Sequence, residues 1–159
     1  MRLVRGSVNA VLMVTLVKPV VRLFVARWRK RMQESAATTI GIPMQELMEA
    51  ALIEELGVDV GVIVSDSFGR PWRLGITDVA LGVSGFRPLD DLRGELDTEG
   101  REMKATVVAV ADELASTAEL ASGKTSRQPA VLIRGARLPA GDGTITGDVL
   151  MPVEQDLFT

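Results

Sequence analysis

The sequence contains neither cysteine nor histidine among its 159 residues. Disulfide bonds, thiol nucleophiles, zinc sites built from cysteine or histidine, and histidine general bases are therefore excluded. Any catalysis by this chain must use oxygen and amine groups. Three roles are compatible with that inventory: a hard cation held by carboxylates and hydroxyls, a lysine or arginine clamp on phosphates, and binding without chemistry.

A long apolar run is also missing. The apolar residues 10–17 are followed at once by Lys18 and Pro19, and this run is well short of the roughly 20 residues that a membrane-spanning helix needs. No small-residue cleavage site of the kind found in secretory signals follows the run. We therefore expect a cytoplasmic protein without a transmembrane helix.

Acidic and basic side chains are unevenly distributed. Residues 1–40 carry eight lysines and arginines against one acid, a net charge of +7, whereas the remainder of the chain carries a net charge of −10. A basic, apolar leader suits an anionic membrane surface or nucleic acid, and it also suits a poorly specified extension or a misplaced start. No clear hydrophobic period organises it. We favour the extension, predict no membrane contact and no nucleic-acid partner, and place the folded domain at residues 41–159.

Periodic patterns begin near residue 42, and the chain has the size and balance of one globular domain. Apolar residues recur at helical or strand spacing, and glycines stand where two helices would end. The patterns predict helices over residues 43–56 and 99–121 and strands over residues 58–65, 76–83 and 130–134. We therefore predict an α+β fold with a mixed sheet packed by helices.

Polar residues on the longer predicted helix have two interpretations. Asp97 or Thr98 is suited to cap its beginning. Four acids lie away from its apolar face, and most of them are expected to be solvated: Glu102, Asp112, Glu113 and Glu119. The sequence leaves open whether Asp112 and Glu113 face water or a site.

An acid and a hydroxyl, Asp66 and Ser67, follow the first predicted strand in the run SDSFGRPWR. Open α/β sheets usually place their ligands at the carboxyl ends of strands. Paired oxygen donors suit Mg²⁺ or Mn²⁺, and Arg70 and Arg73 are placed to neutralise a phosphate nearby. The alternative is that Asp66 and Ser67 only cap a turn and that the arginines are surface residues.

The run Ser122-Gly123-Lys124-Thr125-Ser126 ends like a P-loop. The full pattern needs a glycine at position 118, which is alanine here, and a P-loop follows a strand rather than a helix. We therefore reject a P-loop. Backbone N–H groups, the lysine and the hydroxyls of this loop still suit a nucleotide.

Several motifs occur in a characteristic order over residues 42–135: VIVSDSFGRPWRLGITDVALGVSG, DLRGELDTEGREM, VADELASTAELASGK and PAVLIRG. In this order and spacing they resemble the carboxyl-terminal half of the coenzyme F420 γ-glutamyl ligase family. The resemblance implies an enzyme that uses GTP and two divalent ions, Mg²⁺ or Mn²⁺, to convert a carboxylate of the deazaflavin precursor into an acyl phosphate. The amine of L-glutamate then displaces the phosphate.

The resemblance also implies roles for individual residues. Asp66 ligates one metal ion, and Ser67 stands where the family has a hydroxyl ligand for the second. Lys124 stands where some members have an acidic metal ligand and others a lysine. Independently of the resemblance, the cationic side chains of Arg70 and Lys124 lead us to expect that one of them assists catalysis. The GTP-binding loop comprises Ser122, Gly123, Lys124, Thr125, Ser126, Arg127 and Gln128.

Two features of the family have no counterpart in this sequence. They are its amino-terminal half and a motif of glycine, acid and Ser-Asn that supplies another metal ligand. The domain at residues 41–159 thus resembles about half of an enzyme, with an incomplete fold. We expect a homodimer, exposed apolar surface, and no activity of the chain alone. The alternative function is a non-catalytic nucleotide- or metal-binding remnant, or a half-enzyme that needs a partner chain.

Overall fold

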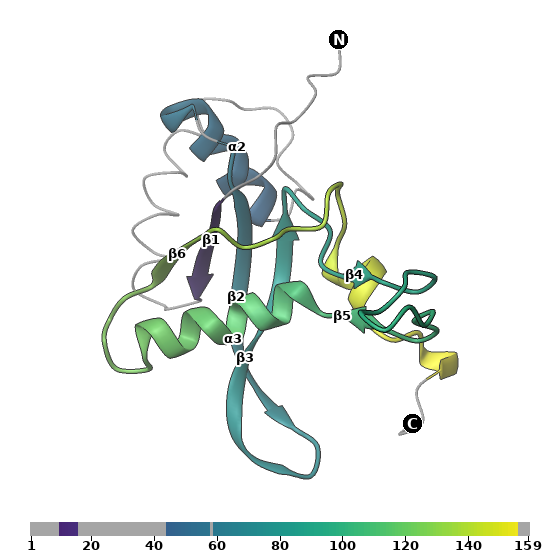
Figure 1. The fold of residues 1–159 in the computed structure, drawn as a ribbon. Coiled ribbons are helices and arrows are strands. Elements are labelled where there is room, and N and C mark those ends of the chain that lie inside the picture. The colour runs from purple at the N-terminus through teal and green to yellow at the C-terminus, as the bar shows by residue number, and fades with distance from the viewer. Residues whose placement is uncertain (1–9, 16–43, 58, 156–159) are drawn as a thin grey trace.

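The computed structural model describes residues 10–15, 44–57 and 59–155. In chain order the elements are β1 (Ala10–Thr15), α2 (Met44–Leu56), β2 (Gly61–Arg70), β3 (Arg73–Ser84), β4 (Asp90–Asp91), β5 (Val107–Val108), α3 (Val110–Ser122), β6 (Ala130–Arg134), and the short helical turns η1 (Ile145–Val149) and η2 (Val153–Gln155). Four strands form one sheet in the order β3-β2-β1-β6, and β4 and β5 form a separate ribbon (Figure 1). Strand β1 is parallel to β2, whereas the other pairs are antiparallel. The predicted α+β fold with a mixed sheet is confirmed.

Strand β1 comes from the segment that the sequence analysis placed outside the folded domain. It lies between β2 and β6 and pairs with residues 61–65 of β2 on one side and residues 130–134 of β6 on the other. The apolar run AVLMVT thereby satisfies backbone groups of both neighbours. Strand β1 is therefore part of the same sheet as β2 and β6, although it precedes residue 41, where the sequence analysis began the folded domain. The basic residues between positions 16 and 43 lie outside the described residues.

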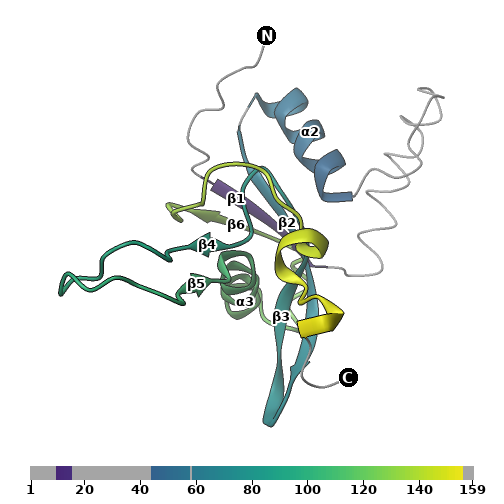
Figure 2. The same ribbon diagram turned by 90° about the vertical axis from the view of Figure 1, so that its right-hand side faces the viewer.

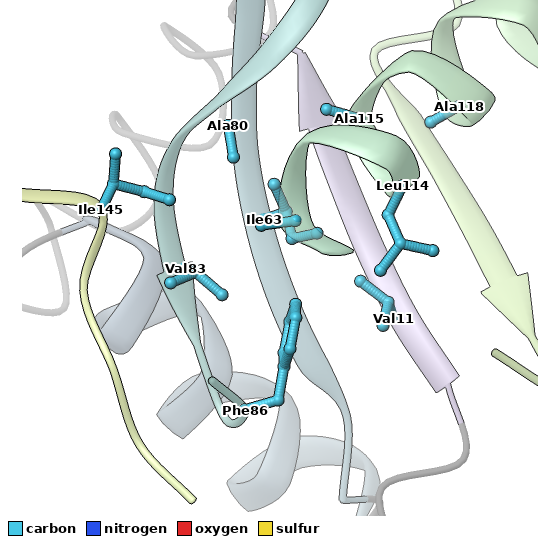
Figure 3. Close-up of a cluster of buried hydrophobic side chains, with 10 residues drawn as sticks. Val11, Ile63, Ala80, Val83, Phe86, Leu114, Ala115, Ala118 and Ile145 are labelled. Atoms are coloured by element: carbon cyan, nitrogen blue, oxygen red, sulfur yellow. The ribbon is translucent and has the colours of Figure 1, made fainter. Parts of the chain in front are cut away.

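The two longer helices lie on opposite faces of the sheet (Figure 2). Because side chains alternate along a strand, Ile63 of β2 and Ala80 of β3 face α3. The main core lies between these strands and α3, whose small residues allow close approach to the sheet (Figure 3). Its buried members are Val11, Ile63, Ala80, Val83, Phe86, Ala111, Leu114, Ala115, Ala118 and Ile145.

Phe86 is the largest fully buried side chain among the residues that the structure describes, with 1% of its surface exposed. Its ring lies against the backbone of Gly61 at the start of β2, where an added Cβ atom would lie 2.8 Å from the ring atom Cδ1. Glycine at this position is therefore needed for the ring to pack as it does.

Helix α2 and strand β6 match their predicted ranges closely. Strand β2 differs, because it continues to Arg70 and forms a long antiparallel hairpin with β3 through a turn at residues 71 and 72. Asp66 and Ser67 lie within this strand, so the expectation that they follow its end is wrong. From residue 66 onward β2 pairs with β3 alone. The outer part of the hairpin, residues 66–77, is called the hairpin arm and extends away from the body of the sheet (Figures 1 and 2).

Helix α3 begins at Val110, eleven residues later than predicted. Residues 89–109 instead form an irregular hairpin, in which the N–H of Leu92 donates to the carbonyl of Thr106 and the N–H of Met103 donates to that of Glu95. Asp97 does not cap a helix. Its Oδ1 accepts from the N–H groups of Glu99 and Arg101 at 2.8 and 2.9 Å, which stabilises a turn that competes with helix formation.

No helix in the described ranges is both long and apolar enough to cross a bilayer.

Candidate functional site

Asp78 is a carboxylate in the middle of β3, and 1% of its side chain is exposed. The strand register places it opposite Ser67 of β2. The hydroxyl of Ser67 donates to its Oδ1 at 3.2 Å, and the hydroxyl of Ser65 donates to its Oδ2 at 3.4 Å. Because burying an isolated carboxylate is costly, Asp78 also needs a positive partner.

Lys124 provides that positive charge. Its Nζ lies 2.7 Å from Asp78 Oδ1 and 2.8 Å from Glu119 Oε1, and it also donates to Ser67 Oγ. The three N–H groups of the ammonium thus have three acceptors. Burial lowers the pKa of Lys124, but the hydrogen bonds to Asp78 and Glu119 outweigh burial and raise it above its ordinary value. Ser67, Asp78, Glu119 and Lys124 are called the lysine cluster.

Helix α3 contributes Glu119 to this cluster and also covers the outer edge of β3. Asp112, Ser116 and Glu119 recur at i, i+4 and i+7, so they lie on one side of the helix. Glu119 Oε2 accepts from the N–H of Asp78 at 2.8 Å, and Asp112 Oδ1 accepts from the N–H of Ala80 at 2.9 Å. Ser116 donates to the carbonyl of Asp78 at 3.0 Å. These bonds satisfy an edge strand. Asp112, which the sequence left open, thus faces the sheet, and Glu119 is not one of the solvated acids of this helix.

The loop of residues 122–128 joins α3 to β6, in the helix-loop-strand context inferred from the sequence. Gly123 has a φ of +69°, and its N–H donates to the carbonyl of Glu119 at 2.7 Å. This turn returns the chain toward Glu119 and places Lys124 against it, where the negative end of the helix also favours a cation. Further along, Ser126 Oγ donates to the carbonyl of Gly123 at 3.2 Å and accepts from the N–H of Gln128 at 3.3 Å. Thr125 and Arg127 are exposed.

The structure brings together some of the residues predicted from the sequence but not all. Ser67 and Lys124, 57 positions apart, are hydrogen-bonded. Asp66 is exposed, and its Oδ1 accepts from the N–H of Ser67 at 2.7 Å; as a strand neighbour of Ser67 it projects from the opposite face of the hairpin. Arg70 lies three residues beyond Ser67 along β2, about 10 Å from it. There its Nη2 donates to the carbonyl of Leu74 at 3.0 Å.

Among the described residues, no three carboxylates are grouped so that they could hold a metal ion. In the lysine cluster, the position between the carboxylates of Asp78 and Glu119 is taken by an ammonium. As it stands, the cluster is therefore an ion-pair network that fastens the loop of residues 122–128 to the hairpin.

The family model for F420-0:Gamma-glutamyl ligase matches residues 43–135. The chain belongs to this ligase family. The matched region includes the hairpin, α3, the loop of residues 122–128 and β6. The family predicted from the sequence motifs is therefore confirmed.

Curated proteins named coenzyme F420:L-glutamate ligase are similar to this chain over the same region. The protein from Methanocaldococcus jannaschii is 51% identical over 108 residues, which cover 67% of this chain and 43% of that protein. The protein from Methanopyrus kandleri is 52% identical over 87 residues, which cover 54% of this chain and 34% of that protein. The chain thus spans less than half the length of these ligases.

Asp78 and Glu119 are members of the lysine cluster that the sequence analysis did not single out. Asp78 has a local signal, since it is a lone acid within the aliphatic run ITDVALGV. The signal for Glu119 is its spacing from Asp112 and Ser116, which border the apolar stripe of α3. Neither signal identifies the partner, because the ion pairs join residues that are distant in sequence.

A separate cleft, with a volume of about 480 Å³, lies between residues 87–93 and residues 139–148 of this ligase-family domain. Asp91 and Arg93 on its lining pair with each other, with Arg93 Nε 2.8 Å from Asp91 Oδ1. The hydrogen bond from Arg93 lowers the pKa of Asp91 from 3.8 to about 2. The described contacts of the lysine cluster involve none of the residues that line this cleft.

Proposed function

We propose that this chain binds GTP and a divalent cation and takes part in the addition of L-glutamate to the deazaflavin precursor of coenzyme F420 through an acyl phosphate. One observation carries the proposal. Within the region that matches the ligase family, Lys124 of the predicted nucleotide-binding loop is bonded to Ser67, the neighbour of the predicted metal ligand Asp66. Residues with complementary proposed roles are therefore adjacent in the fold.

The metal part of the proposal is supported by Asp66. Its carboxylate is exposed and offers hard oxygen donors, which Mg²⁺ and Mn²⁺ prefer. Such ions commonly use one or two protein carboxylates and fill their remaining positions with water and substrate phosphate. A single accessible carboxylate therefore fits this kind of site. When bound, the ion neutralises charge on the triphosphate and on the acyl phosphate.

The nucleotide part of the proposal is supported by the loop of residues 122–128. Most of the loop is exposed, and it contains Gly123, whose missing side chain permits close approach of a ligand to the backbone. Backbone N–H groups, hydroxyls and the cation of Arg127 are the groups that bind phosphate oxygens. We assign Arg70, whose guanidinium is on the exposed hairpin arm, to contact a phosphate oxygen and orient it.

A titration of GTP in the presence of Mn²⁺ tests the assignment of Asp66. We expect Asp66→Ala to weaken GTP binding at least tenfold, because Asp66 would hold the ion that offsets the negative charge of the triphosphate. Asp59→Ala, just before the start of the same strand, is the matched control and is expected to bind as the unaltered chain does. Equal affinity of Asp66→Ala and the unaltered chain would remove Asp66 from the site.

Mass spectrometry of the product tests the reaction. The chain is incubated with GTP, Mn²⁺, L-glutamate and the deazaflavin precursor, beside a full-length relative as the positive control. A glutamylated precursor supports the ligase function of the chain alone. Binding of GTP without product supports the alternative, a nucleotide-binding module that needs a partner chain.

We also propose that the chain forms a homodimer in a cytoplasmic setting. Support comes from apolar side chains on the hairpin arm, where Trp72 is 85% exposed and Leu74 is 99% exposed. Exposed apolar groups that lie close together are typical of interaction surfaces. Light scattering of the purified chain measures the mass, and a monomer at all concentrations would contradict the dimer.

A further inference from the structure

Lys124 lies beside Ser67, where the family resemblance implies a second divalent ion. Its Nζ is 2.7 Å from Asp78 Oδ1 and 2.8 Å from Glu119 Oε1, and it donates to Ser67 Oγ. Three oxygens from three separate elements therefore surround one ammonium. This arrangement is a filled cation position in which the cation is covalently part of the chain.

A divalent ion does not fit beside Ser67 while Lys124 is in place. A ligand oxygen of Mg²⁺ lies about 2.0–2.1 Å from the ion, so an ion on Ser67 Oγ would lie next to the ammonium that donates to the same oxygen. The two positive charges repel each other, and they compete for the same oxygens of Asp78 and Glu119.

The burial of the acidic partners separates this arrangement from an ordinary surface ion pair. The side chain of Asp78 is 1% exposed and that of Glu119 is 17% exposed. Asp78 is also anchored by Ser65, and Glu119 is anchored through its second oxygen to the N–H of Asp78. The carboxylate oxygens of Asp78 and Glu119 are thus held in fixed positions around the ammonium. An ion pair between two mobile surface side chains lacks this fixed geometry.

We infer that Lys124 supplies the positive charge at this position as a tethered ammonium, and that Ser67 does not ligate a divalent ion in this protein. The inference rests on the proposed function, because it concerns the same site. It places the proposed metal ion at Asp66, on the opposite face of the hairpin from Ser67. Lys124 thereby fastens the loop of residues 122–128 to the hairpin without a bridging metal.

The inference predicts what happens when the ammonium is removed. Lys124→Ala leaves Asp78, Glu119 and Ser67 around an open position, and two carboxylates with a hydroxyl and water suit Mn²⁺. We expect this variant to bind one more equivalent of Mn²⁺ than the unaltered chain. Lys104→Ala, which removes an exposed lysine elsewhere, is the matched control and gains no binding.

The test is a Mn²⁺ titration of the full chain without nucleotide, followed by electron paramagnetic resonance. The expected result is an additional equivalent in Lys124→Ala that is lost again in Lys124→Ala/Asp78→Asn. No additional equivalent in a folded Lys124→Ala variant would overturn the inference. Circular dichroism establishes that each variant is folded.

Ser67→Ala gives a second, independent readout, because it removes a single hydroxyl and leaves the ion pairs of Lys124 intact. We expect Mn²⁺ affinity to stay within twofold of the unaltered chain, and a tenfold loss would overturn the inference. Asp66→Ala separates the two proposals. If it leaves Mn²⁺ binding unchanged, the proposed metal site fails, whereas the comparison of Lys124→Ala with its Asp78→Asn double variant still decides the role of Lys124.

Discussion

The two halves of strand β2 differ in composition and in surroundings: the first, GVIVS, is mainly aliphatic, whereas the second, DSFGR, carries an acid and an arginine around Phe68. Its first five residues are buried and its last five are exposed. Ile63 in the first half lies in the core under α3, whereas Phe68 in the second half is 58% exposed. The difference arises because β1 pairs only with residues 61–65, and beyond that point only β3 accompanies the strand. The comparison teaches that the aliphatic half becomes core where a second strand pairs with it, and that an apolar side chain such as Phe68 stays exposed where only β3 accompanies the strand.

The largest expected effect on stability concerns Phe86, whose ring packs against the start of the buried half of β2. Phe86→Ala should lower the free energy of unfolding by about 3–5 kcal/mol, because it removes a fully buried ring and leaves a cavity beside Gly61. Phe68→Ala on the hairpin arm is the control and should change stability by less than about 0.5 kcal/mol. Urea denaturation followed by circular dichroism measures both. Equal losses would show that the hairpin arm is packed in solution.

The boundary between the two halves gives the second prediction. Asp78→Ala should cost about 1–3 kcal/mol, because Lys124, Ser65 and Ser67 each lose the buried carboxylate as an acceptor and Ser65 is itself buried. Asp66→Ala changes an exposed carboxylate next to Ser67, on the opposite face of the hairpin, and should cost less than about 0.5 kcal/mol. The same denaturation experiment compares them, and a similar cost for both variants would contradict the burial of Asp78.

The outer edge of β3 gives the third prediction. Asp112→Ala should cost about 0.5–1.5 kcal/mol, the usual contribution of one hydrogen bond, because its Oδ1 accepts from the N–H of Ala80. Amide hydrogen exchange should become faster at Ala80 than in the unaltered chain. Glu113→Ala changes the exposed neighbour on α3 and should leave that rate unaltered. A slow Ala80 amide in Asp112→Ala would show that another group protects this edge.

The smallest expected effect concerns an exposed ion pair, in contrast to the buried Asp78. The hydrogen bond from Arg93 lowers the pKa of Asp91 from 3.8 to about 2. Because the folded-state pKa is the lower one, the pair stabilises the fold above pH 3.8, and this contribution is lost as the pH falls through about 2. A carboxyl NMR titration should give a midpoint near 2, and Arg93→Gln should move it toward 3.8. An unchanged midpoint would assign the shift to another group.

Local patterns predicted several elements well. Strand β6 has the predicted bounds, and α2 begins one residue later than predicted, because a terminal glycine, a preceding proline and a short apolar run are local signals. The beginning of α3 was not predictable in this way. Apolar residues at helical spacing also occur before Val110, but the turn at Asp97 and the pairing of β4 with β5 hold that segment in an extended form.

The candidate site was predictable in part. Ser67 and Lys124 were singled out by residue type and by resemblance, and the structure joins them directly. Asp78 and Glu119 were not singled out, because their importance depends on a cross-strand register and on the packing of a helix against a sheet edge. Asp66 and Arg70 were also predicted as site residues, yet alternation and distance along the strand keep them outside the lysine cluster.

The sequence by itself determined the chemistry available to this protein and its membership of the ligase family. Without histidine or cysteine, only oxygen donors and cationic nitrogens remain for a site, and the motif order is a property of the chain alone. Only the tertiary structure decided that Lys124 neutralises Asp78, since these residues are 46 positions apart and local propensities act over a few residues. Strand pairing buries the carboxylate, the turn at Gly123 presents the ammonium, and electrostatic attraction at short range joins them.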